Sequence, residues 1–165
     1  MDAESSVTLS MTAVVAAFVF VLTQAIHLGV SIYSQRRSRK NLAKGIYSEI
    51  CSVMQVSGLA SSKEDFEKWI ENATIDEISN HTLVMPYYKV YEQNVSHLGM
   101  LPSSVVSDIV LIYFLFNRMN VAFVHIKKGN IDEYSLSKMK DMMKETVNDI
   151  VKIRKNLDND LKKYL

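Results

Sequence analysis

The feature of this chain that most limits its fold is a long uncharged segment that is followed at once by a basic cluster. Residues 5–35 contain no Asp, Glu, Lys or Arg, and residues 36–40 then read Arg-Arg-Ser-Arg-Lys. A helix that crosses a bilayer needs about 20 mostly apolar residues. Residues 7–32 are long enough to cross with some tilt. The sequence therefore predicts a transmembrane helix within an N-terminal segment, residues 1–35.

A cleaved signal peptide is the main alternative for this segment. Signal peptides begin with basic residues, contain a shorter apolar core and end at small residues. Here the residues ahead of the apolar run are the acidic Asp2 and Glu4, and the run ends in Tyr33, Gln35 and arginines. We therefore expect an anchor that is not cleaved.

The basic cluster predicts the orientation of this anchor. It consists of Arg36, Arg37, Arg39 and Lys40, and positive residues beside a span stay on the cytoplasmic side. We expect a single pass with the N-terminus outside and residues 36–165 in the cytoplasm. Cys51 is the only cysteine, as is usual in a reducing compartment. The same cluster lies where anionic lipid head groups would attract it.

A stripe of small and polar residues runs along the predicted span. Residues three and four apart share one helix face, and these steps give Ser10, Ala13, Ala17, Phe20, Gln24, His27 and Ser31. In lipid, small residues allow close helix contact, and polar residues usually face protein or water. The stripe predicts self-association or the lining of a pore that Phe20 constricts. The alternative is the ordinary composition of a membrane helix, with Gln24 and His27 near the cytoplasmic interface.

Residues 36–165 are numerous enough for one compact domain. The whole chain carries 19 basic and 18 acidic residues, whereas a nucleic-acid-binding domain normally has a strong basic excess on one face. We therefore expect no direct binding of nucleic acid. Prolines and glycines are few, and no useful β-alternation occurs. The predicted fold is all-α, an N-terminal transmembrane helix followed by a cytoplasmic helical bundle.

Cap and turn signals predict where the first cytoplasmic helices begin and end. The membrane helix is expected to continue to about Gly58, with a kink at Gly45. Ser61 is expected to cap a short helix, with Glu64 reaching back to it as in a capping box.

The next signals come from proline and glycine. Pro86 is expected to open a helix that runs through residue 97, with Gly99 as its stop. Pro102 then precedes an apolar helix that is expected to end at Gly129.

That apolar helix could be a second membrane span. Residues 105–124 are apolar, but they include Asp108 and Arg118. An Asp or Arg in the middle of a membrane helix costs roughly 2.5–3.5 kcal/mol. A second crossing would also place the lysine-rich tail outside. We expect instead a helix that is buried in protein on most sides.

The last segment has the strongest periodicity of the chain. Apolar residues recur at alternating steps of three and four, and polar residues fill the positions between them. The repeating residues are Leu136, Met139, Met143, Thr146, Ile150, Ile153 and Leu157. This pattern predicts a long amphipathic helix. Its apolar face is a candidate for self-association or for a partner, and the alternative is an edge helix that packs on its own domain.

No strong catalytic, cofactor or metal motif is present. The glycine patterns that bind phosphates are absent. None of the four histidines lies at metal-ligand spacing from another His or Cys. Cys51 lies on an apolar helix face, which favours packing over a role as a nucleophile. We therefore expect no enzyme activity, no cofactor and no metal.

One spacing resembles the loose signature of HEPN-type ribonucleases. Arg118 and His125 lie seven residues apart on one predicted helix, with Asn117 and Asn120 nearby. In those helical proteins an Arg stabilises phosphate charge and a His moves protons at a dimer interface. The alternative that we favour is structural. In it Arg118 forms an internal ion pair, for example with Asp108, and His125 lies near a helix end.

Three segments resemble a recurring pattern in uncharacterised bacterial single-span membrane proteins. They are Val-Tyr-Glu-Gln-Asn at 90–94, Leu-Gly-Met-Leu-Pro at 98–102 and Ile-Val-Leu-Ile-Tyr at 109–113. The overall plan is also similar to small membrane effectors of anti-phage systems, among them retron-linked membrane toxins and the HEPN-like membrane accessory protein of some CRISPR ribonucleases. The resemblance implies oligomeric permeabilisation of the bacterial inner membrane during infection.

The sequence therefore predicts a membrane-anchored oligomeric effector that perturbs the inner membrane. Its expected partners are the lipid bilayer, other copies of the chain and a soluble protein of a defence system. Two alternatives stay open. One is an anchored scaffold that recruits a soluble partner through residues 130–165, and the other is a divergent HEPN-like ribonuclease.

Overall fold

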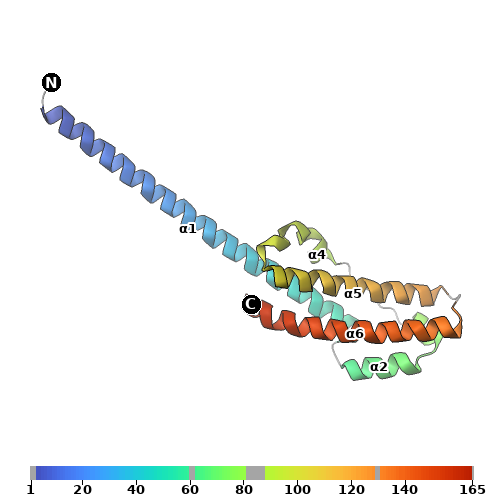
Figure 1. Cartoon of the computed structure of the whole chain (residues 1–165). Helices are drawn as coiled ribbons and strands as arrows, with labels where there is room; N and C mark the ends of the chain where they lie inside the picture. The colour runs from blue at the N-terminus through green and yellow to red at the C-terminus, as the bar shows by residue number, and fades with distance from the viewer. Residues whose placement is uncertain (1–2, 60–61, 81–87, 129–130, 165) are drawn as a thin grey trace. The chain divides into compact units, whose positions relative to one another are not determined.

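The described part of the computed structural model is built from helices (Figure 1). The structure describes residues 3–59, 62–80, 88–128 and 131–164, and the side chains in these ranges apart from 3–13, 79 and 80. The elements are α1 (Ala3–Val56), α2 (Lys63–Asn72), α3 (Ile75–Asn80), α4 (Lys89–Asn94), the 3-10 helix η1 (Val95–Met100), α5 (Ser103–Lys127) and α6 (Glu133–Leu161). No strand occurs in the described ranges, so the predicted all-α class is confirmed.

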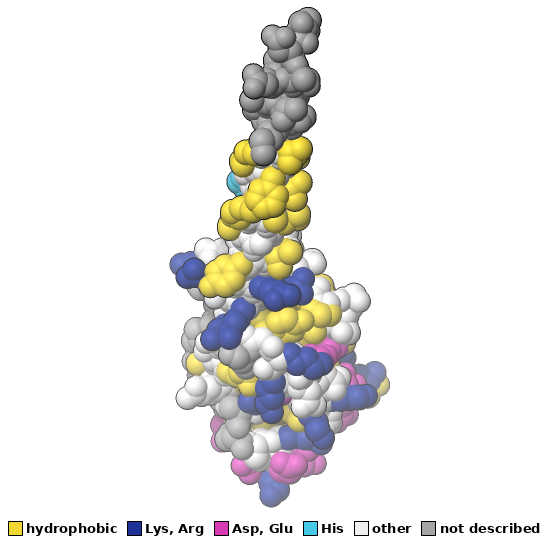
Figure 2. Space-filling view, turned by 90° about the vertical axis from the view of Figure 1, so that its left-hand side faces the viewer, with side chains coloured by type: hydrophobic (Ala, Val, Ile, Leu, Met, Phe, Trp, Pro, Cys, Tyr) yellow, Lys and Arg dark blue, Asp and Glu magenta, His cyan; other side chains and the backbone are white. Residues whose placement is uncertain are grey.

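The chain divides into two compact units, Met1–Arg39 and Lys40–Leu165. The described part of the first unit belongs to α1 alone, and every side chain from residue 14 to residue 39 is exposed. Phe18, for example, keeps 67% of its surface accessible. Figure 2 shows hydrophobic side chains along the part of this helix that it colours.

Among the described residues, two helices are long and apolar enough to cross a membrane. They are Val14–Val56, with a mean hydropathy of 2.0, and Ser103–Lys127, with a mean hydropathy of 1.7. The two differ in burial, because none of the apolar window in the first is buried and half of that in the second is. A core helix of a soluble domain passes the same test of length and composition.

The second unit is built around one hydrophobic core. Figure 1 shows α5 and α6 side by side, with α2 beside α6, and α3 contacts α5. The core draws on α1, α2, α3, η1, α5 and α6. Its largest fully buried side chains are Ile46, Ile50, Met54, Ile70, Ile78, Ile109, Ile112, Phe116, Met119, Ile126, Met143 and Ile150. Burial of such side chains is the main favourable term in folding.

The amphipathic pattern at the end of the chain forms α6, and its apolar face is covered by the domain itself. Met143, Thr146, Ile150, Ile153 and Leu157 are buried, and Leu136 and Met139 are partly buried. The helix begins with Asp132, whose Oδ1 accepts the Ser135 amide at 2.6 Å. Burial of this apolar face within one chain agrees with the alternative of an edge helix that packs on its own domain.

The start of α2 corrects the predicted capping residue. The cap is Ser62, whose Oγ accepts the amide of Asp65 at 2.9 Å, and not Ser61, which lies outside the described residues. A side chain that caps reaches the amide three residues ahead. Since Lys63 is the first helical residue, Ser62 is the position that can do so.

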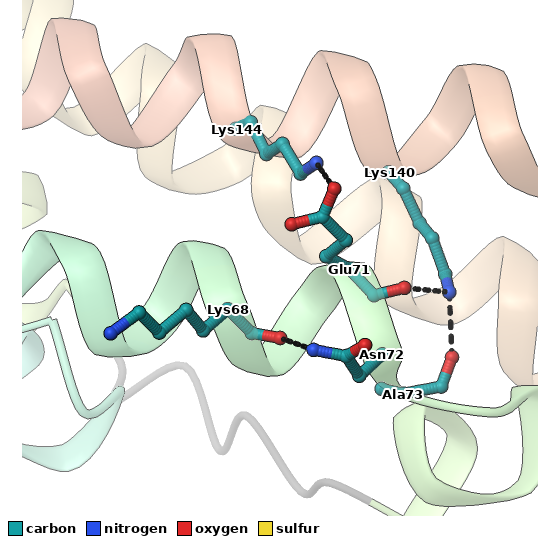
Figure 3. Close-up of polar contacts among 6 residues, drawn as sticks. All are labelled: Lys68, Glu71, Asn72, Ala73, Lys140 and Lys144. Carbon is teal, nitrogen blue, oxygen red and sulfur yellow. Dashed lines mark hydrogen bonds and ion pairs between the residues drawn. The ribbon is translucent and has the colours of Figure 1, made fainter.

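The end of α2 is held by a lysine from α6 (Figure 3). Lys140 Nζ donates to the carbonyls of Glu71 at 3.1 Å and of Ala73 at 2.7 Å. The Glu71 carboxylate lies 3.4 Å from Lys144 Nζ. The last carbonyls of a helix have no partner within it, and a cation stabilises their partial negative charge. Lys140, which is far from α2 in the sequence, therefore caps the C-terminal end of α2.

The glycines after the anchor play different parts. Gly58 has a φ of +74° directly after α1, which confirms the predicted stop. The helix α1 continues through Gly45, as the predicted extension of the membrane helix to about Gly58 requires. A Cβ at Gly45 would lie 3.1 Å from Val90 Cγ1, so the glycine allows close approach.

The predicted helix from Pro86 to residue 97 is only partly correct. Pro86 lies outside the described residues, and α4 begins at Lys89 and changes to the 3-10 helix η1 at Val95. Gly99 lies inside η1 and is not its stop. The helix η1 ends at Met100. The next residue, Leu101, is extended at φ −91° and ψ 159°, because the residue before a proline avoids the helical region.

The helix α5 is less buried than expected. Its inner face is buried, but its outer face exposes Val110, Leu111, Phe114, Val121 and Val124 by 44–61%. The prediction of burial on most sides is therefore wrong for this outer face. The predicted end at Gly129 lies outside the described residues, and α5 itself ends at Lys127.

The buried position Ile150 offers a test of the core. Ile150→Ala should lower the free energy of unfolding by about 2–5 kcal/mol, because the truncated side chain leaves a cavity. Urea unfolding of the full chain in detergent, followed by the fluorescence of the single tryptophan Trp69 on α2, measures this change.

The matched control is the exposed neighbour Asp149. Asp149→Ala should change the free energy by less than about 0.5 kcal/mol. Equal effects of the two substitutions would contradict the described packing of α6.

Candidate functional site: a groove along α5

The carboxylate of Glu49 on α1 joins three helices at the candidate site. Glu49 accepts the amide of Val90 at 2.7 Å and the amide of Tyr91 at 3.0 Å, and the hydroxyl of Tyr113 on α5 also donates to it. At the start of α4, Tyr88 gives no side-chain cap. Glu49 therefore takes the place of a capping residue, with a negative charge at the positive end of the helix.

Four aromatic rings surround this contact. The rings of Tyr91 and Tyr113 stack with their centres 4.1 Å apart, and Tyr88 meets Tyr113 edge to face at 5.0 Å. Phe116 lies edge to face against Tyr113 at 6.3 Å. Such pairs stabilise beyond the area that they bury. The cluster fixes the first residues of α4 against α5.

Burial alters the acid–base behaviour of these phenols. It raises the pKa of Tyr88 to about 12, and the charge of Glu49 adds to the rise. The pKa of Tyr113 also rises, through burial and then through its hydrogen bond to Glu49. Since a free phenol titrates at about 10, both groups stay neutral near pH 7. Their contribution to stability is complete below about pH 10 and is lost as the pH rises through their folded pKa values.

Two adjoining hollows lie along the outer face of α5. The narrower one, of about 300 Å³, lies over the aromatic cluster and is lined by Tyr88, Tyr91, Glu92, Val110, Tyr113, Phe114 and Asn117. The wider one, of about 450 Å³, is lined by Phe114, Asn117, Arg118, Val121, Ala122 and His125 of α5 and by Lys138, Met139 and Met142 of α6. Because Phe114 and Asn117 line both, we call the two hollows together the α5 groove.

The spacing of Arg118 and His125 places both in the wider hollow. The expected ion pair between Arg118 and Asp108 is wrong, since the Arg118 guanidinium forms no ion pair or hydrogen bond with the residues that the structure describes. Burial, and then the charge of Asp160, raises the pKa of Asp108, which forms no ion pair within the described ranges. His125 lies in the last turn of α5, as expected for a residue near a helix end.

The other predicted residues lie on α1. Ala17, Phe20, Gln24, His27 and Ser31 are all exposed, and the side chains of Ser10 and Ala13 lie outside the described residues. Arg36, Arg37, Arg39 and Lys40 are exposed as well.

Cys51 is half-buried on α1, one turn after Tyr47. Burial, then Cys51 and Asp158, raises the pKa of Tyr47 to about 12. The sequence did not predict a contact between Tyr47 and Asp158, because the two residues are far apart in the chain and no spacing pattern relates them.

No group of His, Cys, Asp and Glu that could hold a metal ion occurs within the ranges that the structure describes. Comparison with known proteins finds no matching family model, no similar curated protein and no similar solved structure.

The contact at Glu49 offers a test of how the groove is held. Glu49→Ala should speed hydrogen exchange of peptides covering residues 88–100 by about 10- to 100-fold, because a hydrogen bond to a charged group contributes about 1.5–3 kcal/mol. Hydrogen exchange with mass spectrometry on the full chain in detergent measures it.

Glu92→Ala is the matched control, because Glu92 is an exposed carboxylate in the first turn of α4. It should leave the exchange of this segment nearly unchanged. If Glu49→Ala also left it unchanged, the role assigned to Glu49 would be refuted.

Proposed function

We propose that this chain is a membrane-anchored effector that assembles with copies of itself in the bacterial inner membrane and perturbs the bilayer. The observation that carries the proposal is the anchor part of α1, where every described side chain from residue 14 to residue 39 is exposed. A helix with apolar residues on most sides and no covering from its own chain needs lipid around it.

The polar stripe supports assembly over simple anchoring. Gln24 and His27 are exposed on a helix that is otherwise rich in Val, Phe and Leu, and Ala17 and Ser31 lie at helical spacing from them. Polar groups that face hydrocarbon are costly, so they usually face protein or water. Small residues on the same face let neighbouring helices approach closely. Contact between copies along this stripe would satisfy both needs.

The basic cluster supports an orientation in which the helical domain is cytoplasmic. Arg36, Arg37, Arg39 and Lys40 are exposed at the end of the apolar segment, where the positive-inside rule keeps them on the cytoplasmic side. In this orientation a soluble protein of a defence system could contact the domain and trigger assembly. That last step rests on the resemblance to anti-phage effectors.

A double substitution in the stripe tests this function. Expression of the chain in bacteria should lower the membrane potential, measured with a potential-sensitive dye. Gln24→Leu with His27→Leu should weaken the effect several-fold, because each interhelical hydrogen bond in a membrane contributes about 0.6 kcal/mol and an oligomer repeats the contact.

The matched control is Val15→Leu with Val19→Leu on the apolar side of the same helix. It should leave the effect intact. A stripe variant that depolarises as strongly as the unchanged chain would argue against a polar contact or conduit. If the unchanged chain did not depolarise, the effector function itself would fail.

A divergent ribonuclease is the second candidate, and one specific observation favours it. Arg118 and His125 line the same hollow, with Lys138 beside them. A cationic side chain can stabilise phosphate charge, and a histidine can transfer protons.

Degradation of cellular RNA on expression tests the second candidate. If it holds, Arg118→Ala with His125→Ala should lower cleavage by at least about 100-fold. Lys127→Ala should not, because Lys127 lies on the same helix outside the hollow. Intact RNA in cells that the unchanged chain depolarises would remove this candidate.

A further inference from the structure

The wider hollow of the α5 groove has the size and walls of a ligand site. Its volume of about 450 Å³ falls within the range of small-molecule pockets, about 300–1,000 Å³. Val121 and Ala122 from α5 face Met139 and Met142 from α6. Methionine side chains are flexible and adapt to irregular apolar shapes. The walls therefore suit a flexible hydrocarbon chain.

The polar side of this hollow is positive. Arg118 and Lys138 line it together with the hydrogen-bonding groups of Asn117 and His125, and no Asp or Glu is among the described residues that line it. Lys138 Nζ already lies 4.4 Å from the centre of the Tyr134 ring. A planar guanidinium fits a carboxylate or phosphate with two parallel hydrogen bonds. Arg118 is the cation that an anionic ligand would meet first.

The apolar surface here is unusually exposed for a domain helix. Phe114 keeps 61% of its surface accessible and Val121 keeps 48%, and both line the hollow. Apolar patches on a soluble domain often mark a binding surface. Inorganic phosphate would leave these walls uncovered, and a neutral hydrocarbon would leave Arg118 without an acceptor. A ligand that carries both an apolar chain and a negative head matches the two sides at once.

We propose that this hollow binds a single-chain amphiphile with an anionic head, of the class of fatty-acid carboxylates and alkyl phosphates. The Arg118 guanidinium donates hydrogen bonds to the anionic head, and the apolar chain lies between Val121 of α5 and Met139 and Met142 of α6. The proposal stands apart from the function of the anchor, because it involves only residues of the helical domain.

The experiment uses the full chain in nanodiscs of zwitterionic lipid, so that no detergent competes for the hollow. The probe is a photoactivatable laurate analogue, and mass spectrometry locates the labelled residues. Labelling should concentrate on the lining segments of α5 and α6. Laurate and dodecyl phosphate should displace the probe, which identifies the head groups that the site accepts. Dodecyltrimethylammonium and dodecanol should displace it about tenfold less well.

Variants separate the charge from the cavity. Arg118→Met keeps an unbranched apolar side chain and should weaken labelling about tenfold, the loss of one charge-assisted hydrogen bond. Val121→Trp narrows the hollow and should abolish labelling, although all cations are retained. Lys127→Met removes a cation of the same helix outside the hollow and should leave labelling unchanged. Circular dichroism of each variant checks that the helices are retained.

Several results would overturn the proposal. They include labelling confined to the anchor, equal displacement by the cationic and anionic amphiphiles, and displacement by inorganic phosphate as effective as by laurate. Labelling that persists in both Arg118→Met and Val121→Trp would also overturn it. So would a change in oligomer mass in these variants with unchanged labelling, because the hollow would then be a contact between copies.

Discussion

A carboxylate on one helix supplies the acceptor that three donors from two other elements require. Glu49 receives two amides at the start of α4 and the hydroxyl of Tyr113 on α5. At the short helix α2 a cation takes the corresponding role at the opposite end, because Lys140 of α6 donates to the last carbonyls of α2. Helices as short as α2 and α4 are unstable alone in water. Each is held because a long neighbouring helix completes its end, and the aromatic part of the α5 groove depends on the first of these contacts.

The parts of the fold that sequence could predict are those fixed by neighbouring residues. The three-four spacing from Leu136 to Leu157 gave α6, and Gly58 gave the end of α1. What the sequence could not predict depends mostly on distant residues. Gly45 allows the close approach of Val90, and no local pattern contains that information. The segment that was predicted as one helix after Pro86 changes from α4 to the 3-10 helix η1. This helix ends where Leu101, which precedes Pro102, becomes extended.

The candidate site shows the same division. The spacing of Arg118 and His125 could be read from the sequence, since both lie on one helix. The acceptor role of Glu49 could not, because its partners lie 41, 42 and 64 residues away and it has the appearance of an ordinary polar residue on an amphipathic helix. The hollow itself needs Met139 and Met142 opposite Val121, and this pairing arises only when α6 packs on α5.

The close approach at Gly45 links two positions that are far apart in the chain. Because a methyl group at residue 45 would meet Val90 Cγ1 at 3.1 Å, the two residues share one small volume between α1 and α4. A side chain at residue 45 requires Val90 to give way by a few tenths of an ångström, or a smaller residue in its place. In related chains the sizes of these two residues should therefore vary inversely. Residues 45 and 90 would then covary in an alignment because of this helix contact.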